Sequence, residues 1–223
     1  MKNILVTGAN RGIGLELVAQ LAGRGEQVLA ACRVTSAELD ALAAKGVRVE
    51  TGVDMTSDAS ARSLGERLRE VDLDWLILNA GTLEVGGLED LDAESLKRQY
   101  DVNAVGPLRV VKALLPNLKK GSKIGLVSSR VGSVADNTSG GMYGYRMSKS
   151  AMNMAGKCLA LDLAPRGVSV VVLHPGFIRT RMTGGNGNDG PDVAARGLIA
   201  RMDTLGPATS GRFFHANGEE LPW

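Results

Sequence analysis

Short runs of β-branched and aliphatic residues alternate along most of the chain with longer stretches in which apolar residues recur at helical spacing. The short runs predict strands near residues 3–7, 27–32, 47–51, 73–78, 122–128, 168–173 and 211–215. The longer stretches predict helices near residues 12–24, 36–45, 58–70, 92–118 (broken), 142–164 and 191–203. Strands separated by helices of this length pair in parallel, with helices on both faces of the sheet. The pattern therefore predicts a doubly wound α/β fold.

The apolar content also bears on domain organisation. The runs 76–78 and 170–173 are apolar on both faces, as central strands of a parallel sheet should be. A chain of 223 residues with 44% hydrophobic content can bury one sizeable core, and no repeat or linker marks a boundary. We therefore expect one domain over residues 1–223, with a short substrate loop near 177–203. Within that loop, the glycine-rich segment 183–190 is expected to be mobile.

Charge and cysteine content exclude several classes of function. Lys and Arg number 26 against 24 Asp and Glu, so a net charge of +2 gives no case for nucleic-acid or membrane binding. Cys32 and Cys158 lie far apart without metal-ligand spacing, which argues against a disulfide framework or a metal site. No apolar run is long enough to span a bilayer, and residues 1–3 lead directly into a strand without a targeting leader. We expect a soluble protein of the cytoplasm.

The most informative motif is the glycine turn Thr-Gly-Ala-Asn-Arg-Gly-Ile-Gly at residues 7–14. It follows a predicted strand and opens a predicted helix, whose free N–H groups and dipole attract a pyrophosphate. With 29 glycines in the chain, a simple turn is the alternative, but the placement favours dinucleotide binding. The residues expected to contact the dinucleotide here are Gly8, Asn10, Gly12, Ile13 and Gly14.

Two arginines predict which dinucleotide is bound. The second predicted strand ends at Cys32 and Arg33, where an NAD-binding site commonly has an acidic residue against the ribose 2′-hydroxyl. A carboxylate would repel a 2′-phosphate, whereas a guanidinium binds it. Arg11, inside the glycine turn, is a second cation. These residues favour NADP(H) over NAD(H), unless both are merely solvated surface side chains.

Polar residues also follow the next two predicted strands. Asp54, followed by Met55, could accept a hydrogen bond from the adenine amino group or could cap the helix expected near Thr56. The segment Asn79-Ala80-Gly81 could let a ribose lie close to the backbone, and its amide could tie neighbouring strands together. An ordinary turn is the alternative there.

The catalytic chemistry is indicated by Tyr145 and Lys149, which share one helix face, and by the pair Ser128-Ser129 at a strand end. The ammonium should lower the tyrosine pKa toward working pH, as a general acid/base for alcohol–carbonyl interconversion requires. The serine hydroxyl could stabilise charge on the substrate oxygen. Such a Tyr–Lys pair is common on helix surfaces, but the flanking cofactor cleft favours catalysis. Tyr143 lacks this spacing because residue 147 is Met.

The remaining polar candidates are less specific. Asn103 lies inside the helical stretch that begins at Asp92, where an asparagine is mildly unfavourable unless its side chain has a task or faces water. His174 precedes the turn Pro175-Gly176, and His215 falls in the last strand, where a structural role is expected. No nucleophile elbow, phosphate-binding lysine motif or metal-ligand cluster is present.

Taken together, these motifs resemble the short-chain dehydrogenase/reductase superfamily over nearly the whole chain. The glycine turn 7–14, the segment 79–81, Asn103, Ser129, Tyr145-x-x-x-Lys149 and Pro175-Gly176 occur in the family's order and approximate spacing. The sequence around Tyr145 and the Gly-Arg-Phe-Phe…Leu-Pro-Trp ending look like the C-factor and sniffer-type carbonyl reductase group.

The resemblance implies a single Rossmann-type domain with a seven-stranded parallel sheet and a nicotinamide cofactor. It implies that Tyr145 transfers the proton, that Lys149 binds the nicotinamide ribose and lowers the tyrosine pKa, and that Ser129 orients the carbonyl. Asn103 would hold a water of the proton relay. Further cofactor contacts would come from Pro175, Gly176, Ile178 and Thr180. Relatives are commonly homodimers or homotetramers through the helix that corresponds to residues 142–164.

The leading hypothesis is an NADPH-dependent carbonyl reductase for a small or hydrophobic ketone or aldehyde. An alternative is an NADP-binding signalling or regulatory protein of the C-factor type, although such a protein has no need of a proton-transfer set. An NAD-linked alcohol dehydrogenase is disfavoured by Arg33. The glycines at 140–141 and 184–190 offer few side chains to define a substrate.

Overall fold

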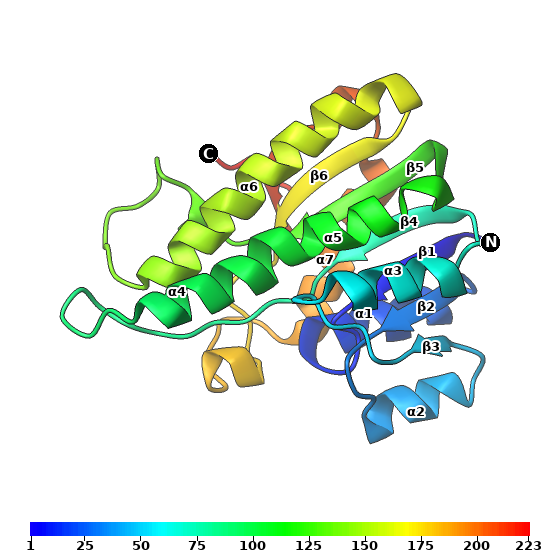
Figure 1. The fold of residues 1–223 in the computed structure, drawn as a ribbon, viewed down its shortest axis with the longest axis horizontal. Helices are drawn as coiled ribbons and strands as arrows, with labels where there is room; N and C mark the ends of the chain where they lie inside the picture. The colour runs from blue at the N-terminus through cyan, green and yellow to red at the C-terminus, as the bar shows by residue number, and fades with distance from the viewer.

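The computed structural model describes residues 1–223 and contains one seven-stranded sheet, ordered β3-β2-β1-β4-β5-β6-β7 (Figure 1). Every neighbouring pair is parallel. The strands are β1 (Asn3–Thr7), β2 (Gln27–Ala31), β3 (Arg48–Glu50), β4 (Leu73–Leu78), β5 (Leu118–Val127), β6 (Ser169–His174) and β7 (Arg212–His215). The predicted doubly wound, Rossmann-like sheet is confirmed. Because the strand order reverses beside β1, the crevice for a ligand opens where β1 and β4 end.

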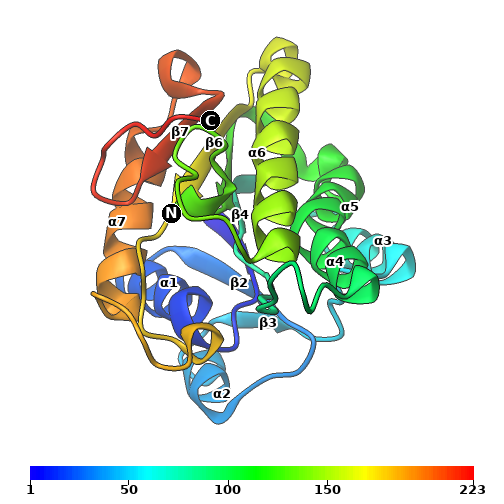
Figure 2. The same ribbon diagram turned by 90° about the vertical axis from the view of Figure 1, so that its left-hand side faces the viewer.

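Helices cover both faces of the sheet (Figure 2). One face carries α1 (Gly12–Gly23) and α7 (Pro191–Thr204), with α2 (Ala37–Ala43) near the β3 edge. The other face carries α3 (Asp58–Arg67), α4 (Ala93–Tyr100), α5 (Gly106–Ala113) and α6 (Tyr143–Leu163). No helix is both long and apolar enough to cross a membrane.

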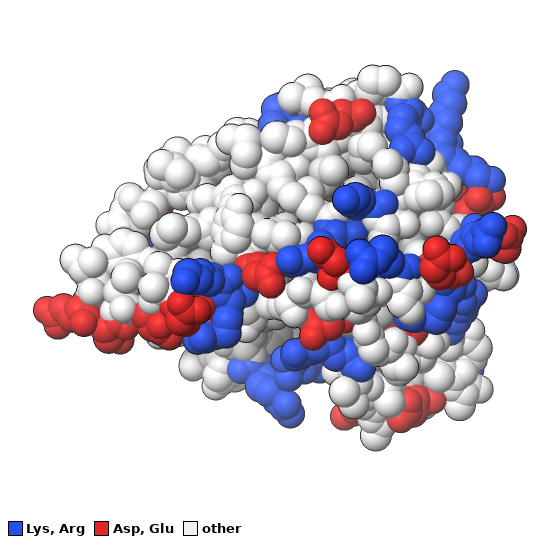
Figure 3. Space-filling model, viewed as in Figure 1, with Lys and Arg blue, Asp and Glu red and all other residues white.

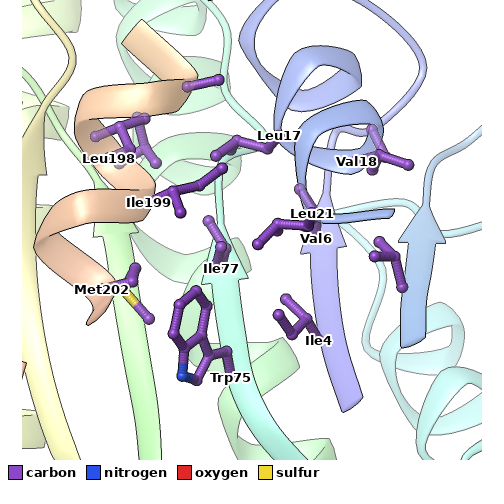
Figure 4. Packing of buried hydrophobic residues seen from close by; sticks show 14 of the residues in the cluster. Ile4, Val6, Leu17, Val18, Leu21, Trp75, Ile77, Leu198, Ile199 and Met202 are labelled. Carbon is purple, nitrogen blue, oxygen red and sulfur yellow. The ribbon is translucent and has the colours of Figure 1, made fainter. Parts of the chain in front are cut away.

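The core is divided into two layers by the alternation of side chains along the strands. In β1, Ile4 and Val6 point to the layer under α1 and α7, whereas Leu5 points to the opposite layer under α3, α5 and α6. Trp75 and Ile77 of β4 join the first layer (Figure 4). The helix residues that meet them there include Leu17, Leu21, Leu198, Ile199 and Met202. This packing holds the carboxyl ends of β1 and β4 rigidly beside each other.

Two elements differ in detail from the predicted pattern. β5 begins at Leu118, earlier than expected, and its pairing with β4 shifts register between Leu73 and Trp75. The predicted broken helix 92–118 consists of α4 and α5 joined by the π-helical turn Asp101–Val105, followed by the short 3₁₀ turn Leu115–Asn117. The π-helical turn brings Asn103 to the site described below.

The glycine-rich segment 183–190 folds back on the residues that follow β6. The Arg179 N–H donates to the Asp189 carbonyl at 2.9 Å, and the Asn188 N–H donates to the Phe177 carbonyl at 2.7 Å. A β-carbon on Gly187 would lie 2.4 Å from the Arg179 backbone nitrogen. Glycine is therefore needed here for close approach of two backbone segments.

Candidate active site

The glycine turn forms a cradle at the carboxyl end of β1. A β-carbon on Gly14 would lie 2.2 Å from the Gly8 carbonyl oxygen, and one on Gly8 would lie 2.8 Å from the Ala80 Cα. Gly8 also has a φ of +66°, which favours glycine. The helix α1 starts at Gly12, and no side chain caps its N-terminus. The free N–H groups of its first turn fit a pyrophosphate.

Asn79 ties the ends of β1 and β4 together, as one of the two interpretations of this segment predicted. Its Nδ2 donates to the carbonyl oxygens of Thr7 at 3.1 Å and Gly8 at 3.3 Å. In return, the backbone N–H groups of Asn79 and Ala80 donate to the Thr7 hydroxyl, each at 3.1 Å. Thr7 was not among the predicted site residues, because only the pairing of β1 with β4 reveals its role.

Two unpaired cations lie next to this cradle. Arg11 and Arg33 are exposed, and neither forms an ion pair. Asn10 links the glycine turn to the segment after β2, because its Nδ2 donates to the Val34 carbonyl at 2.9 Å. The guanidinium groups therefore remain free for an anionic ligand beyond the end of β2.

Asp54 does not cap the following helix, so that interpretation is wrong. Ser57 is the cap of α3, because its hydroxyl accepts from the Ser60 N–H at 3.1 Å. The Asp54 carboxylate instead accepts from the backbone N–H and hydroxyl of Thr56, at 2.9 and 2.8 Å, and these bonds lower its pKa. The neighbouring Met55 is buried against Gly106.

The helix α6 positions Tyr145 and Lys149 on one face, with the ammonium 5.7 Å from the centre of the tyrosine ring. Lys149 is buried without a carboxylate partner. Its Nζ donates to the Val127 carbonyl at 2.9 Å and lies 3.6 Å from the Met152 Sδ. Burial lowers the pKa of Lys149 to about 8. A buried ammonium without a carboxylate partner can donate hydrogen bonds to polar atoms of a ligand.

The sequence predicted that Lys149 lowers the pKa of Tyr145, and this prediction is wrong. Burial raises the pKa of Tyr145 to about 12, and a hydrogen bond with Ser129 only partly offsets this. Removing water from the phenolate outweighs the stabilisation that this hydrogen bond provides. Tyr145 is therefore a protonated phenol at neutral pH, with the buried Ser129 as its polar neighbour.

Asn103 joins the segment after β4 to α6. Its Oδ1 accepts from the Thr82 N–H at 2.8 Å, while its Nδ2 donates to the Thr82 carbonyl at 2.8 Å and to the Ser148 hydroxyl at 3.0 Å. These hydrogen bonds explain why an asparagine lies inside this helical stretch, within a π-helical turn. A β-carbon on Gly81 would lie 3.2 Å from the Asn103 Oδ1 and 3.7 Å from the Lys149 Nζ, so these groups converge.

The segment after β6 returns to the glycine turn. Pro175 and Gly176 leave the strand, with a φ of +100° at Gly176, and Ile178 is buried. Thr180 then passes the start of α1, where its Cγ2 would lie 3.5 Å from a β-carbon on Gly12. The structure therefore brings together three of the strand-end segments assigned to the cofactor: the glycine turn, residues 79–81 and residues 175–180.

His174 forms an edge-on pair with His215, the ring centres being 4.8 Å apart. The Nδ1 of His215 accepts from the Asn217 N–H at 3.0 Å, whereas the Nδ1 of His174 is buried without a partner. Burial, and then the nearby His215 and cations, lower the pKa of His174 to about 3. His174 is therefore a neutral packing group in the folded protein.

We expect this histidine to make the protein sensitive to mild acid. Its pKa is about 3 when folded and 6.5 in the reference state, so the unfolded chain binds more protons between these values. The free energy of unfolding should fall as pH drops below 6.5, by up to about 1.4 kcal/mol per pH unit from this group. Urea unfolding between pH 7 and 4.5 should give a flatter profile for His174→Gln than for the wild type. If the pH profiles of the wild type and the variant were parallel, His174 would not be the cause of the acid sensitivity.

The fold and the site define a class of protein: a dinucleotide-binding oxidoreductase with a serine, a tyrosine and a buried lysine beside the cofactor cradle. A family model for short chain dehydrogenases matches residues 2–190. The chain belongs to the short-chain dehydrogenase/reductase family.

Its relatives place it in the C-factor and sniffer-type group. It is 46% identical to a 1-hydroxy-2-glutathionyl-2-methyl-3-butene dehydrogenase from Rhodococcus sp. (strain AD45), with both chains covered completely. It is 44% identical to the C-signal protein of Myxococcus xanthus, over 68% of this chain and 93% of that one. The solved carbonyl reductase Sniffer of D. melanogaster superimposes with a TM-score of 0.93 at 29% identity over 100% of both chains. The NADPH-bound carbonyl reductase from chicken fatty liver gives 0.91 at 30% identity, over 100% of this chain and 99% of that one.

Proposed function

We propose that this protein is an NADP(H)-dependent carbonyl reductase in which Tyr145 is the general acid. The observation that carries this proposal is the buried, unneutralised Lys149 beside Tyr145 and Ser129 at the rim of the glycine cradle. Burying an ammonium, a phenol and a hydroxyl costs free energy, and a proton-transfer site explains why they occur together.

The cofactor is proposed to lie along the carboxyl ends of the strands. The first turn of α1 would hold the pyrophosphate, Arg11 and Arg33 the 2′-phosphate, and Asp54 and Met55 the adenine. The ribose and nicotinamide would lie against Asn79, Ala80, Gly81, Tyr145, Lys149, Pro175, Gly176, Ile178 and Thr180. When bound, NADPH supplies a hydride for the carbonyl carbon.

The protein's own groups would manage the charge on the substrate oxygen. Ser129 donates a hydrogen bond to that oxygen, and Tyr145, a protonated phenol at neutral pH, donates the proton. The Lys149 ammonium, with a pKa of about 8, stabilises the phenolate that remains. Asn103 keeps the segment after β4 and Ser148 of the tyrosine helix in place. The protonated phenol suits the reductive direction.

We expect Arg33→Ala to weaken NADPH binding selectively. The loss of a charged hydrogen bond to the 2′-phosphate should cost about 1.5–3 kcal/mol, or on the order of tenfold to a hundredfold in Kd. NADH affinity should not change, because NADH has no 2′-phosphate. Fluorescence titration with both cofactors measures this, and Arg69→Ala, an exposed arginine in the connection before β4, is the control. Equal losses for NADPH and NADH would exclude the assigned role.

The proposed function is tested by titrating the protein with NADPH and NADH and then following NADPH oxidation with a panel of ketones, aldehydes and quinones. Tight NADPH binding with turnover supports a reductase. Alcohols with NADP⁺ or NAD⁺ belong in the same panel, including a glutathionyl hydroxyalkene, because the Rhodococcus relative is named as a dehydrogenase of such a compound.

A second candidate function is that of an NADP-binding signalling or regulatory protein. The similarity to the C-signal protein of Myxococcus xanthus favours it. Tight NADPH binding without turnover on any carbonyl or alcohol of the panel would support this alternative. The reductase is preferred because a cofactor sensor does not require Ser129, Tyr145 and Lys149 together.

A homodimer or homotetramer through α6 is also proposed. The exposed residues Met147, Met154 and Leu161 recur every seven positions along this helix, with exposed fractions of 57%, 65% and 65%. The surface over α6 carries few charges (Figure 3). Such an apolar stripe fits a second helix of the same kind, and sedimentation equilibrium measures the resulting mass.

A further inference from the structure

We propose that Arg146 is a positioning residue that clamps the loop between Ser129 and Tyr145, and that this clamp sets both the catalytic geometry and the selection of substrates. The inference rests on the proposed function and adds to it a residue outside the serine, tyrosine and lysine set. We call residues 130–142 the clamped loop. It begins directly after Ser129, and α6 with Tyr145 follows directly after it.

One guanidinium contacts both ends of the clamped loop. Arg146 follows Tyr145 on α6 and donates to three backbone carbonyls and one hydroxyl of the loop. The acceptors are the carbonyl oxygens of Val131 at 3.2 Å, Gly140 at 3.1 Å and Gly141 at 3.1 Å, and the Ser139 hydroxyl at 2.8 Å. The planar fork of arginine can reach several acceptors at once, which the single ammonium of lysine cannot do in the same geometry.

The far end of the loop depends on this support. Gly140, Gly141 and Met142 are consecutive residues with φ values of 63°, 67° and 46°, and Met142 is the one non-glycine residue with positive φ in the protein. A left-handed conformation is unfavourable for methionine. Nothing lies within 4 Å of the β-carbon positions of Gly140 and Gly141, so side-chain packing does not hold this turn. The turn is held by the hydrogen bonds from Arg146 to the two glycine carbonyls, together with the Gly140 N–H, which donates to the Asn137 Oδ1 at 3.1 Å.

The near end of the loop transmits its position to the catalytic groups. The 3₁₀ turn Arg130–Gly132 presses on α6, because a β-carbon on Gly132 would lie 2.7 Å from the Lys149 carbonyl carbon. The Ser150 hydroxyl donates to the Gly132 carbonyl at 2.7 Å. On its other side, Arg130 pairs with Asp136 at 2.8 Å and with Glu219 at 2.6 Å. A displaced loop would therefore move Ser129 relative to Tyr145.

The clamp lies apart from the segments proposed to hold the pyrophosphate, the 2′-phosphate and the adenine, which follow β1, β2 and β3. Arg146 donates no hydrogen bond to those segments. Loosening the clamp should therefore change proton transfer and the shape of the substrate side more than it changes NADPH affinity.

The test compares Arg146→Met and Arg146→Lys with the wild type. The matched control is Arg166→Met, which removes an arginine that donates to one backbone carbonyl, that of Leu115, beyond the far end of α6. Arg146→Met should lower kcat by about tenfold to a hundredfold, since small displacements of reacting groups have effects of this size. It should also change the ratio of kcat/KM between a small aldehyde and a bulky aromatic ketone by about tenfold. The lysine variant should recover only part of the activity, and the control should match the wild type.

A second measurement does not depend on turnover. Hydrogen–deuterium exchange of peptides spanning residues 130–142 should be faster in Arg146→Met than in the wild type and Arg166→Met. Unchanged exchange in this loop would overturn the clamp. A loss of activity with unchanged selectivity between the two substrates would overturn the positioning role. If the wild type itself turns over no substrate, the proposed function fails, and the exchange data alone then decide whether Arg146 holds the loop.

Discussion

Replacing Tyr145 with phenylalanine should lower kcat by about 10²–10⁴-fold while NADPH binds almost as tightly as to the wild type. The substitution removes a single hydroxyl and leaves the ring in place. Burial keeps this phenol protonated, with a pKa of about 12, so the hydroxyl is the proton donor that the proposed reduction requires. Stopped-flow measurement of NADPH oxidation at saturating substrate, together with a fluorescence titration of NADPH, separates the proton transfer from cofactor binding.

The chain provides a matched control two residues earlier on the same helix. Tyr143 is 38% exposed and has Met147 four residues later instead of a lysine. Tyr143→Phe removes the same hydroxyl from a site without the ammonium and should leave kcat unchanged. Near-normal turnover of Tyr145→Phe, or equal losses in the two variants, would show that Tyr145 is not the general acid.

Adding one methyl group at Gly14 should both destabilise the fold and abolish NADPH binding. The new β-carbon would lie 2.2 Å from the Gly8 carbonyl oxygen and 2.6 Å from the Asn79 Nδ2. The first contact is with backbone, so α1 must move away from the glycine turn. Overpacking of this kind costs about 1–3 kcal/mol, and a clash with backbone belongs at the upper end of this range. The displacement also breaks the alignment of the first N–H groups of α1 with the pyrophosphate. Urea unfolding and an NADPH titration measure the two effects.

Gly23, at the other end of α1, gives the opposite expectation for the same substitution. Nothing lies within 4 Å of its β-carbon position. Gly23→Ala should therefore raise the free energy of unfolding by about 0.5–1 kcal/mol, because alanine loses less conformational entropy in a helix. If Gly14→Ala were as stable as the wild type, the close packing of the cradle would be refuted.

Much of the fold and part of the site could be predicted because they depend on local patterns. The alternation of buried strands and amphipathic helices requires parallel pairing, and the glycine turn lies between one strand and one helix. The Tyr145–Lys149 pair needs only the periodicity of a single helix. The short-chain dehydrogenase resemblance added the order of motifs, from which the roles of Ser129 and Asn103 followed as expectations.

Other features involve residues far apart in the chain, and only the tertiary structure decided them. The role of Thr7 depends on Asn79, and that of Asn103 depends on Thr82 and Ser148. The sequence allowed Asp54 to bind adenine or to cap the following helix. Only the tertiary structure excluded the cap, because Ser57 occupies that position. No local pattern predicts such contacts, since they depend on strand order and on how loops return to the sheet.

The ionisable groups of the site also separate what the sequence determines from what the tertiary structure determines. The sequence by itself determined that this chain is a doubly wound dinucleotide-binding protein with a tyrosine and a lysine on one helix face, because periodicity and spacing are local properties. The tertiary structure decided that burial raises the pKa of Tyr145 and lowers that of Lys149, and that Arg146 reaches both ends of the loop beside them. Desolvation depends on everything that packs around a group, and that surrounding exists only once the chain has folded.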